Sequence, residues 1–126
     1  MKKTACLLAV WLMLAASAQA LGTLDGKTFG GQVVDKSKGV EHAQPADFVF
    51  ANGKFKSSFP RAAGYVPDKY TTSTEGNSIR FQSQMANKAG GKVQWSGMVR
   101  GQDIEGIFTV AEDGRNGEYW FKGRLR

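Results

Sequence analysis

Residues 92–110, KVQWSGMVRGQDIEGIFTV, decide the fold of this 126-residue chain, because they contain its longest pair of matching strand patterns. Apolar and polar residues alternate on both sides of Gly101-Gln102, which is typical of antiparallel strands with one buried and one wet face. A two-residue turn at Gly101-Gln102 joins such strands into a hairpin. The resulting pairs on the buried face are Val99 with Ile104, Gly97 with Gly106, and Trp95 with Phe108.

A third strand extends this unit to the C-terminus. The segment Asp113-Gly114-Arg115-Asn116 is predicted to form a four-residue turn, so that Phe108 faces Phe121. One face then carries four cross-strand rows, which together make an apolar surface crossed by a row of glycines. The rows are Val93–Val110–Tyr119, Trp95–Phe108–Phe121, Gly97–Gly106–Gly123 and Val99–Ile104–Leu125.

Two more hairpins precede this unit. Asn52-Gly53 is a preferred two-residue turn because both positions adopt positive φ, and it pairs Phe50 with Phe55 beside Phe48. The second turn, Gly76-Asn77, places six residues on one face: Tyr70, Thr72, Thr74, Ile79, Phe81 and Ser83. The same alternation directs four basic side chains to the wet face: Lys54, Lys56, Arg80 and Arg100.

The chain is therefore predicted to be all-β, with a first strand near its start. The eight expected strands are 28–34, 47–51, 54–58, 70–75, 78–85, 92–100, 103–111 and 117–125. Hairpins in sequential order favour an antiparallel, eight-stranded up-and-down barrel, in which closure removes exposed sheet edges. An open sandwich and a five-stranded oligomer-binding barrel are the alternatives.

Residues 1–20 have the pattern of a signal peptide. Lys2 and Lys3 precede an apolar run, and Ala18-Gln19-Ala20 is a cleavage site of the A-x-A type. The apolar run, residues 5–16, is too short for a spanning helix, which needs about 20 residues. We expect a signal peptide at 1–20, a single barrel domain at 21–126, and export to the periplasm or the medium. A retained membrane anchor is the alternative.

Cleavage changes which chemistry the chain can support. It removes Cys6, the only cysteine, and lowers the formal net charge from +6 to +4. Because no cysteine remains, neither a Cys–His pair nor a thiolate zinc site can form. The single histidine, His42, lies in a polar stretch and is expected to be a solvated loop residue. We therefore expect no enzyme, cofactor or metal. The scattered basic residues form no stripe of the kind that binds nucleic acid.

The glycine row admits two interpretations. Glycines allow a small barrel to bend, and an aromatic ring such as Phe50 or Phe81 can fill the space beside them. Alternatively, the row is an open slot for a flat or elongated apolar ligand. Because the basic side chains point outward, such a ligand would be neutral or would hold its polar end at the mouth of the barrel. The residues expected to line that slot are Phe50, Phe55, Phe81, Trp95, Gly97, Gly106, Phe108, Tyr119 and Phe121.

Two surface features are candidates for protein contact. Trp120 is predicted on the outer face beside Thr109 and near Ile107, where tryptophan often anchors a partner, unless the segment 21–24 covers it. Tyr65 belongs to the apolar loop 59–67, which either caps one end of the barrel or forms a rim that touches a partner.

Motifs distributed along the chain carry a family resemblance: Leu24-Asp25-Gly26-Lys27-Thr28-Phe29, Phe50-x-Asn52-Gly53-Lys54-Phe55-x-Ser57, Trp95-Ser96-Gly97-Met98-Val99-x-Gly101-x-x-Ile104-Glu105-Gly106 and Tyr119-Trp120-Phe121-Lys122-Gly123-Arg124-Leu125. Through them the chain resembles small exported bacterial proteins of the calycin, or lipocalin-like, type. The resemblance implies an eight-stranded barrel and no particular activity. The G-x-W of a lipocalin first strand is replaced by Gly26-Lys27-Thr28-Phe29.

The first functional hypothesis is a non-catalytic exported barrel that binds a small apolar ligand in its aromatic interior. The second is an envelope interaction module or hydrolase inhibitor that acts through its loops and Trp120.

Overall fold

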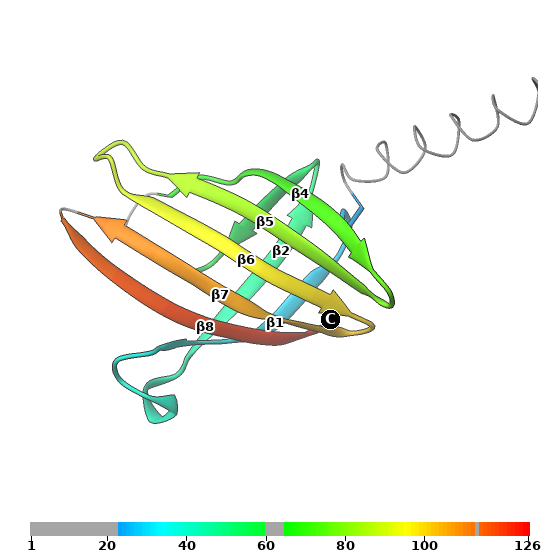
Figure 1. Cartoon of the computed structure of the whole chain (residues 1–126), viewed down its shortest axis with the longest axis horizontal. Coiled ribbons are helices and arrows are strands. Elements are labelled where there is room, and N and C mark those ends of the chain that lie inside the picture. Colours follow the sequence, from blue (N-terminus) through cyan, green and yellow to red (C-terminus); the bar gives the residue numbers. More distant parts are fainter. Residues whose placement is uncertain (1–22, 60–64, 113) are drawn as a thin grey trace, which may run out of the picture.

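A computed structural model describes residues 23–59, 65–112 and 114–126, and these form a closed barrel (Figure 1). The strands are β1 (Thr28–Asp35), β2 (Gln44–Ala51), β3 (Lys54–Ser57), β4 (Asp68–Glu75), β5 (Ser78–Ala86), β6 (Lys92–Arg100), β7 (Asp103–Glu112) and β8 (Arg115–Leu125). A short 3-10 helix, η1 (Val40–His42), follows β1. The predicted signal peptide lies outside the described residues.

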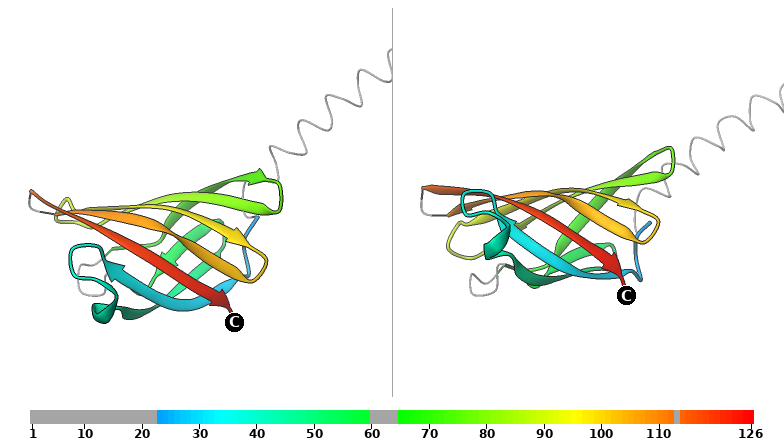
Figure 2. Two further views of the ribbon diagram at one scale, coloured as in Figure 1. Left: turned by 60° about the horizontal axis from the view of Figure 1, so that its bottom comes forward. Right: turned by 90° about the horizontal axis from the view of Figure 1, so that it is seen from below.

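Every strand is antiparallel to the next, and β1 also pairs with β8, so that the sheet closes. Figure 2 shows β1 and β8 side by side from two directions. The predicted up-and-down barrel is confirmed, and the sandwich and five-stranded alternatives are wrong. The strand ranges agree closely with the predictions; β2 begins three residues earlier, because Gln44 still pairs with Val33 of β1.

The first three hairpin registers are confirmed. Phe50 faces Phe55, Thr72 faces Phe81, and Gly97 faces Gly106. In each case the turn contains a glycine at positive φ: Gly53, Gly76 and Gly101.

The register predicted between β7 and β8 is wrong by two residues. Glu112 pairs with Arg115, which leaves only residues 113 and 114 for the turn, and Gly114 has a φ of 75°. A two-residue turn has a backbone twist that matches the twist of the flanking strands, and the dipeptide Asp-Gly favours such a turn because glycine readily adopts positive φ. The inward face is kept, but Phe108 faces Tyr119 and Gly106 faces Phe121.

Because of this shift in register, the predicted row of three glycines does not form. The corrected rows are Val93–Val110–Gly117, Trp95–Phe108–Tyr119, Gly97–Gly106–Phe121 and Val99–Ile104–Gly123. Gly123 instead faces Gly31 of β1, where a Cβ on Gly31 would meet the backbone of residues 122 and 123. The glycines thus occur as two adjacent pairs, one between β6 and β7 and one between β8 and β1.

One end of the barrel is closed by the segment that precedes β1. Leu24 is buried, and its backbone N–H donates to the Tyr70 hydroxyl at 3.0 Å. That hydroxyl donates to Asp25 at 2.7 Å, and the Asp25 carboxylate accepts the N–H of Gly53 at 2.9 Å. Leu24 therefore plugs the barrel rather than covering Trp120; residues 21 and 22 lie outside the described part.

The other end is covered in part by the connection between β3 and β4. The ring of Phe59 lies 5.9 Å from that of Phe108 and 5.4 Å from that of Tyr119. Tyr65 packs against the core, and its hydroxyl donates to Glu112 at 2.8 Å. These two residues cap the barrel as one interpretation predicted, whereas 60–64 are not described.

Burial, and then the hydrogen bond to Asp25, raise the pKa of the Tyr70 hydroxyl, and burial also raises the pKa of Tyr119. A phenol whose pKa is higher in the folded state stabilises the protein below its unfolded pKa and loses that contribution above about pH 10. We expect the free energy of unfolding, measured by urea denaturation, to fall as the pH rises from about 9 to about 11.

Replacing Tyr70 by Phe isolates its share. Tyr70→Phe leaves the buried N–H of Leu24 unpaired, which lowers the free energy of unfolding by about 1–3 kcal/mol near neutral pH. Above about pH 10 the free energy of unfolding of this variant should decline less steeply than that of the wild type. Equal slopes for the two proteins would contradict the assignment to Tyr70.

Candidate functional site

The structure brings the nine expected interior residues together. All belong to the inward face, and the six aromatics other than Tyr119 are almost wholly buried. Their rings touch one another: Trp95 stacks on Phe108 with centroids 4.1 Å apart, and Phe108 on Tyr119 at 4.7 Å. Phe50 lies 5.0 Å from each of Phe55 and Phe81. The inward face is thus a packed aromatic cluster.

Rings also occupy the space beside the two facing glycines. A Cβ on Gly97 would lie 2.6 Å from Phe81 and 2.7 Å from Phe121. A Cβ on Gly106 would meet the backbone of Ser96 and Gly97. The glycines therefore admit close ring and backbone packing, as the first interpretation predicted. Phe81 fills the space as expected, although Phe121 shares it with Phe81.

One polar atom in this cluster has no partner. The indole N–H of Trp95 is buried and makes no hydrogen bond within the described part of the chain. It belongs to a ring that is in edge contact with Phe48, Phe55 and Phe121. An unpaired buried donor of this kind costs about 1–3 kcal/mol.

The outer wall has a feature of its own, a row of outward residues with no charge. The strand registers align six of them across β4, β5, β6, β7, β8 and β1, and we call them the outer row: Thr71, Gln82, Ser96, Ile107, Trp120 and Val34. Half of the row is polar and half is apolar. Side chains two residues away on the same strands add Gln84, Gln94 and Thr109 beside the polar half.

Two adjoining hollows lie along the outer row, and together we call them the outer groove. One, of about 460 Å³, extends from Thr71 across Gln82 and Ser96 to Ile107, with Lys69 at its edge. The other, of about 600 Å³, extends from Ile107 across Trp120 to Val34, with Val40 of η1 at its side. Ile107 lines both, so the two hollows are continuous in the row.

Exposed apolar side chains gather at the second hollow. Among the described residues, four large hydrophobic side chains are exposed: Val40 (69%), Val66 (59%), Trp120 (50%) and Ile107 (42%). Three of the four line the 600 Å³ hollow. Val34 also points outward but is only 6% exposed, because it faces Trp120 across the strands and shares the hollow with Val40. The prediction that Trp120 lies on the outer face near Ile107 is confirmed, but Thr109 faces Glu118 and not Trp120, because the register is shifted by two residues.

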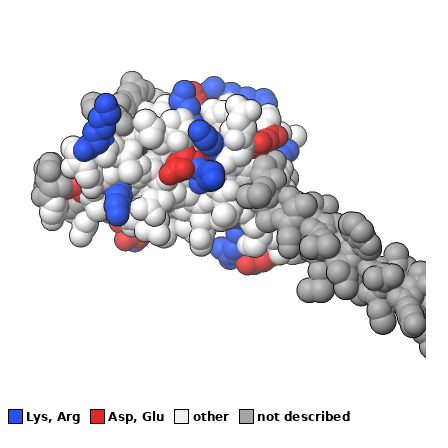
Figure 3. All heavy atoms as spheres, turned by 90° about the horizontal axis from the view of Figure 1, so that it is seen from above, with Lys and Arg blue, Asp and Glu red and all other residues white. Residues whose placement is uncertain are grey.

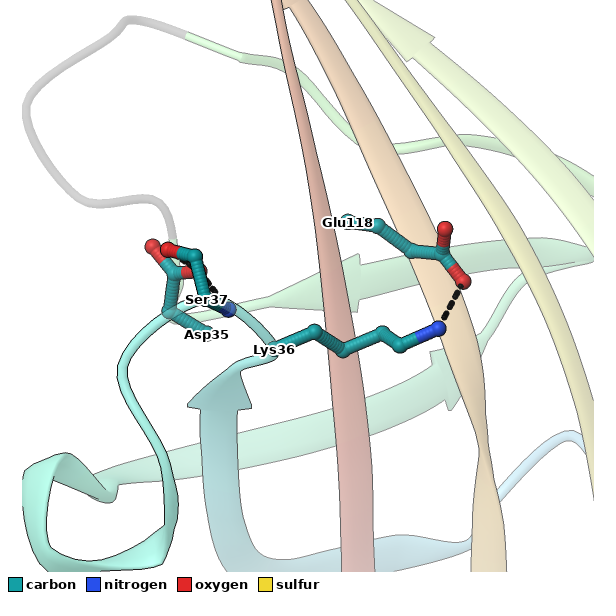
Figure 4. Close-up of polar contacts among 4 residues, drawn as sticks. All are labelled: Asp35, Lys36, Ser37 and Glu118. Atoms are coloured by element: carbon teal, nitrogen blue, oxygen red, sulfur yellow. Dashed lines mark hydrogen bonds and ion pairs between the residues drawn. The ribbon is translucent and has the colours of Figure 1, made fainter.

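The turn after β1 fixes the position of Trp120. The Lys36 ammonium lies 5.6 Å from the centroid of the Trp120 ring and 2.9 Å from the Glu118 carboxylate. Figure 4 shows Lys36 reaching across β8 to Glu118. A cation over an aromatic face is attracted by the ring quadrupole, so Lys36 restrains one face of the indole.

Asp35 and Ser37 hold Lys36 in this orientation. The Asp35 carboxylate accepts the Ser37 hydroxyl at 2.7 Å and the Ser37 N–H at 2.9 Å (Figure 4). The hydrogen bond from the Ser37 hydroxyl is the main cause of the lowered pKa of Asp35. The backbone N–H of Lys36 donates to the carbonyl of Glu118 at 3.1 Å. Gly39, at a φ of 94°, then lets the chain turn into η1, which carries Val40.

Charged side chains flank the outer row in both signs. Arg80 pairs with Glu75 at 2.6 Å, and Glu105 faces Lys122 across β7 and β8. On the face in Figure 3, basic and acidic groups are interspersed and no continuous basic stripe crosses the surface. The outward positions expected for Lys54, Lys56, Arg80 and Arg100 are confirmed by their exposure.

Within the three described segments, no three His, Cys, Asp or Glu side chains come together in a way that could hold a metal ion. His42 is exposed in η1, on the loop where the sequence predicted it. No helix in the described part of the chain has the length and apolar character that a membrane span requires.

Comparison of the chain with protein-family models, with curated proteins and with solved structures found no match. The eight-stranded barrel agrees with the calycin-like resemblance at the level of fold.

Sequence reasoning missed the polar half of the outer row. Each hairpin showed its uncharged outward positions, Gln82, Ser96 and Ile107 among them, but the row appears only when the registers are joined across strands. The available signal was the absence of charge at consecutive outward positions of two neighbouring strands, Gln82, Gln84 and Ala86 in one and Gln94, Ser96 and Met98 in the other.

Packing against the facing glycines can be tested by adding one methyl group. Gly106→Ala places a Cβ against backbone that cannot move aside, so we expect it to lower the free energy of unfolding by about 1–3 kcal/mol. Gly117→Ala is the matched control, because its nearest neighbour is a Tyr119 side-chain atom at 3.2 Å.

The control should change stability by less than about 1 kcal/mol. Urea denaturation of the two variants and the wild type measures the difference. A Gly106→Ala protein as stable as the wild type would show that the space beside Gly106 is open, as the slot interpretation requires.

Proposed function

We propose that residues 21–126 form an exported, non-catalytic binding barrel, and that its ligand is an extended, uncharged molecule held in the outer groove. The observation that carries this proposal is the gathering of Val40, Ile107 and Trp120 on one hollow of the outer wall. A contiguous apolar patch with polar surroundings on a small protein marks an interaction site. Tryptophan is enriched among residues that dominate binding energy.

The uncharged floor supports an uncharged ligand. The six residues of the outer row carry no charge, and the charged residues at the edges of the two hollows, Lys69, Glu105 and Lys122, are of both signs. Binding of a carboxylate or phosphate normally uses an Arg or Lys with free donors. Here Lys36 is engaged by Glu118, and the Lys122 position faces Glu105. Lys69 is an exposed exception, and it lies at the Thr71 end of the row, away from Trp120.

The packed interior favours the outer wall over the barrel lumen as the binding site. In some eight-stranded barrels side chains fill the interior, and in others the interior has room for one small ligand. In this chain Phe81 and Phe121 fill the space beside Gly97 and Gly106. The aromatic cluster then acts as the rigid support of the groove.

A small apolar ligand inside the barrel, the first hypothesis from the sequence, is the second candidate. The observation in its favour is the unpaired indole N–H of Trp95, which a ligand with one hydrogen-bond acceptor would satisfy. Such a ligand would have to displace rings of the aromatic cluster.

Tryptophan fluorescence separates the two candidates. Beyond the predicted leader the chain contains only Trp95, which is buried, and Trp120, which is exposed. Trp95→Phe leaves a reporter of the outer groove, and Trp120→Phe leaves a reporter of the interior. Titration uses two probes, an uncharged hexasaccharide and the neutral apolar quencher 1-bromodecane, whose bromine atom quenches tryptophan emission only near contact.

We expect a saturable change in the emission of Trp95→Phe with at least one probe and none in Trp120→Phe, since the bound probe contacts Trp120. Circular dichroism confirms that both variants fold. A saturable response confined to Trp120→Phe would move the ligand to the interior, and silence of both variants would reject both sites for these probes.

Export is tested separately with the full chain expressed in a Gram-negative host. The protein recovered from the periplasm or medium should begin at Leu21, as N-terminal sequencing or intact mass would show. Recovery of the chain only in membranes, with Met1 retained, would support the anchor alternative.

A further inference from the structure

We infer that the ligand of the outer groove is a neutral carbohydrate chain. This inference rests on the proposed function, because it names the chemical class of the molecule that the groove would bind.

The polar half of the groove has the hydrogen-bonding character that sugars require. Gln82 and Gln94 carry amides and Thr71, Ser96 and Thr109 carry hydroxyls, and each of these groups can both donate and accept. All five side chains are exposed. Within the described residues none of them forms a side-chain hydrogen bond. They are therefore available to hydroxyl groups, which also donate and accept.

The apolar half offers a surface for the C–H face of a sugar ring. Trp120 is an exposed flat ring beside Ile107, and Lys36 restrains it from one side. An indole with one apolar face available suits a ligand that is apolar on its face and polar at its edge. A pyranose has this character, whereas a purely apolar molecule would leave the polar half of the groove unused.

The shape of the groove favours a chain over a single small molecule. The outer row crosses six strands of the closed barrel, so it follows an arc of roughly 24 Å around the wall at the usual spacing between neighbouring strands. Its hollows of about 460 and 600 Å³ follow one another along this line. Several sugar units in succession would contact Trp120, Ile107 and Gln82 in turn.

A peptide fits the groove less well. Addition of a peptide strand needs an unpaired sheet edge, but β5, β6, β7 and β8 beneath the groove are paired on both sides. An amphipathic helix needs a continuous apolar groove, whereas the floor from Thr71 to Ser96 is polar.

The test is isothermal titration calorimetry of the mature protein, purified after expression of the full chain. The probes are uncharged hexasaccharides of α-linked glucose, β-linked glucose and β-linked N-acetylglucosamine. We expect one of them to bind, and Trp120→Ala to weaken that binding by at least about tenfold. Trp120→Phe, which keeps a ring, should retain part of the affinity, and Gln82→Ala should weaken binding severalfold.

Lys56→Ala is the matched control, because Lys56 is exposed on the outer face of β3, which contributes no residue to the outer row. It should leave the affinity unchanged. The affinity should also change little between about 50 and about 500 mM NaCl, because screening affects only charged ligands.

The outcomes separate the inference from the proposed function. If no hexasaccharide binds but an uncharged peptide does, with loss in Trp120→Ala, the carbohydrate inference is overturned and the groove keeps its role. If a hexasaccharide binds equally well to Trp120→Ala, Gln82→Ala and the wild type, both are overturned. If no saccharide or peptide binds, the carbohydrate inference fails, and the fluorescence titration with the apolar quencher decides the proposed function.

Discussion

The close approach of aromatic rings to two facing glycines is the contact on which this barrel depends. Gly97 and Gly106 face each other across β6 and β7, and Phe81 and Phe121 occupy the space that their side chains would fill. Protein interiors are packed as densely as organic crystals, so a single added carbon in such a place is felt. The rings can meet across a narrow barrel only because Gly97 and Gly106 have no side chains.

This packing divides the two faces of the sheet between two tasks. Because successive side chains in a strand point to opposite faces, each core residue has an outward neighbour. Phe108 is next to Ile107, and Phe121 is next to Trp120. The inner face supplies cohesion, and the outer row can therefore hold unpaired amides, hydroxyls and an exposed indole without loss of core packing.

Much of the fold could be predicted from the sequence, because alternation and turn chemistry are local signals. The turns at Asn52-Gly53, Gly76-Asn77 and Gly101-Gln102 set three registers correctly. The last register was misjudged because both a two-residue and a four-residue turn keep Phe121 inside, so polarity alone could not separate them. The complete outer row could not be predicted, since its residues come together only after four hairpin registers, the last of them misjudged, and the closure of the sheet are combined.

The pairing of β1 with β8 has a consequence for how the chain reaches its working form. Val34 faces Trp120 across the closing seam, so one wall of the groove comes from the start of the domain and the other from its end. Contacts between residues so distant in sequence form slowly, because the cost of closing the loop precedes the gain from the contact. During synthesis the groove cannot exist until the last strand has arrived. A chain that stops short of β8 would therefore lack the site as well as the closed sheet, so incomplete copies could not compete with the finished protein for its ligand.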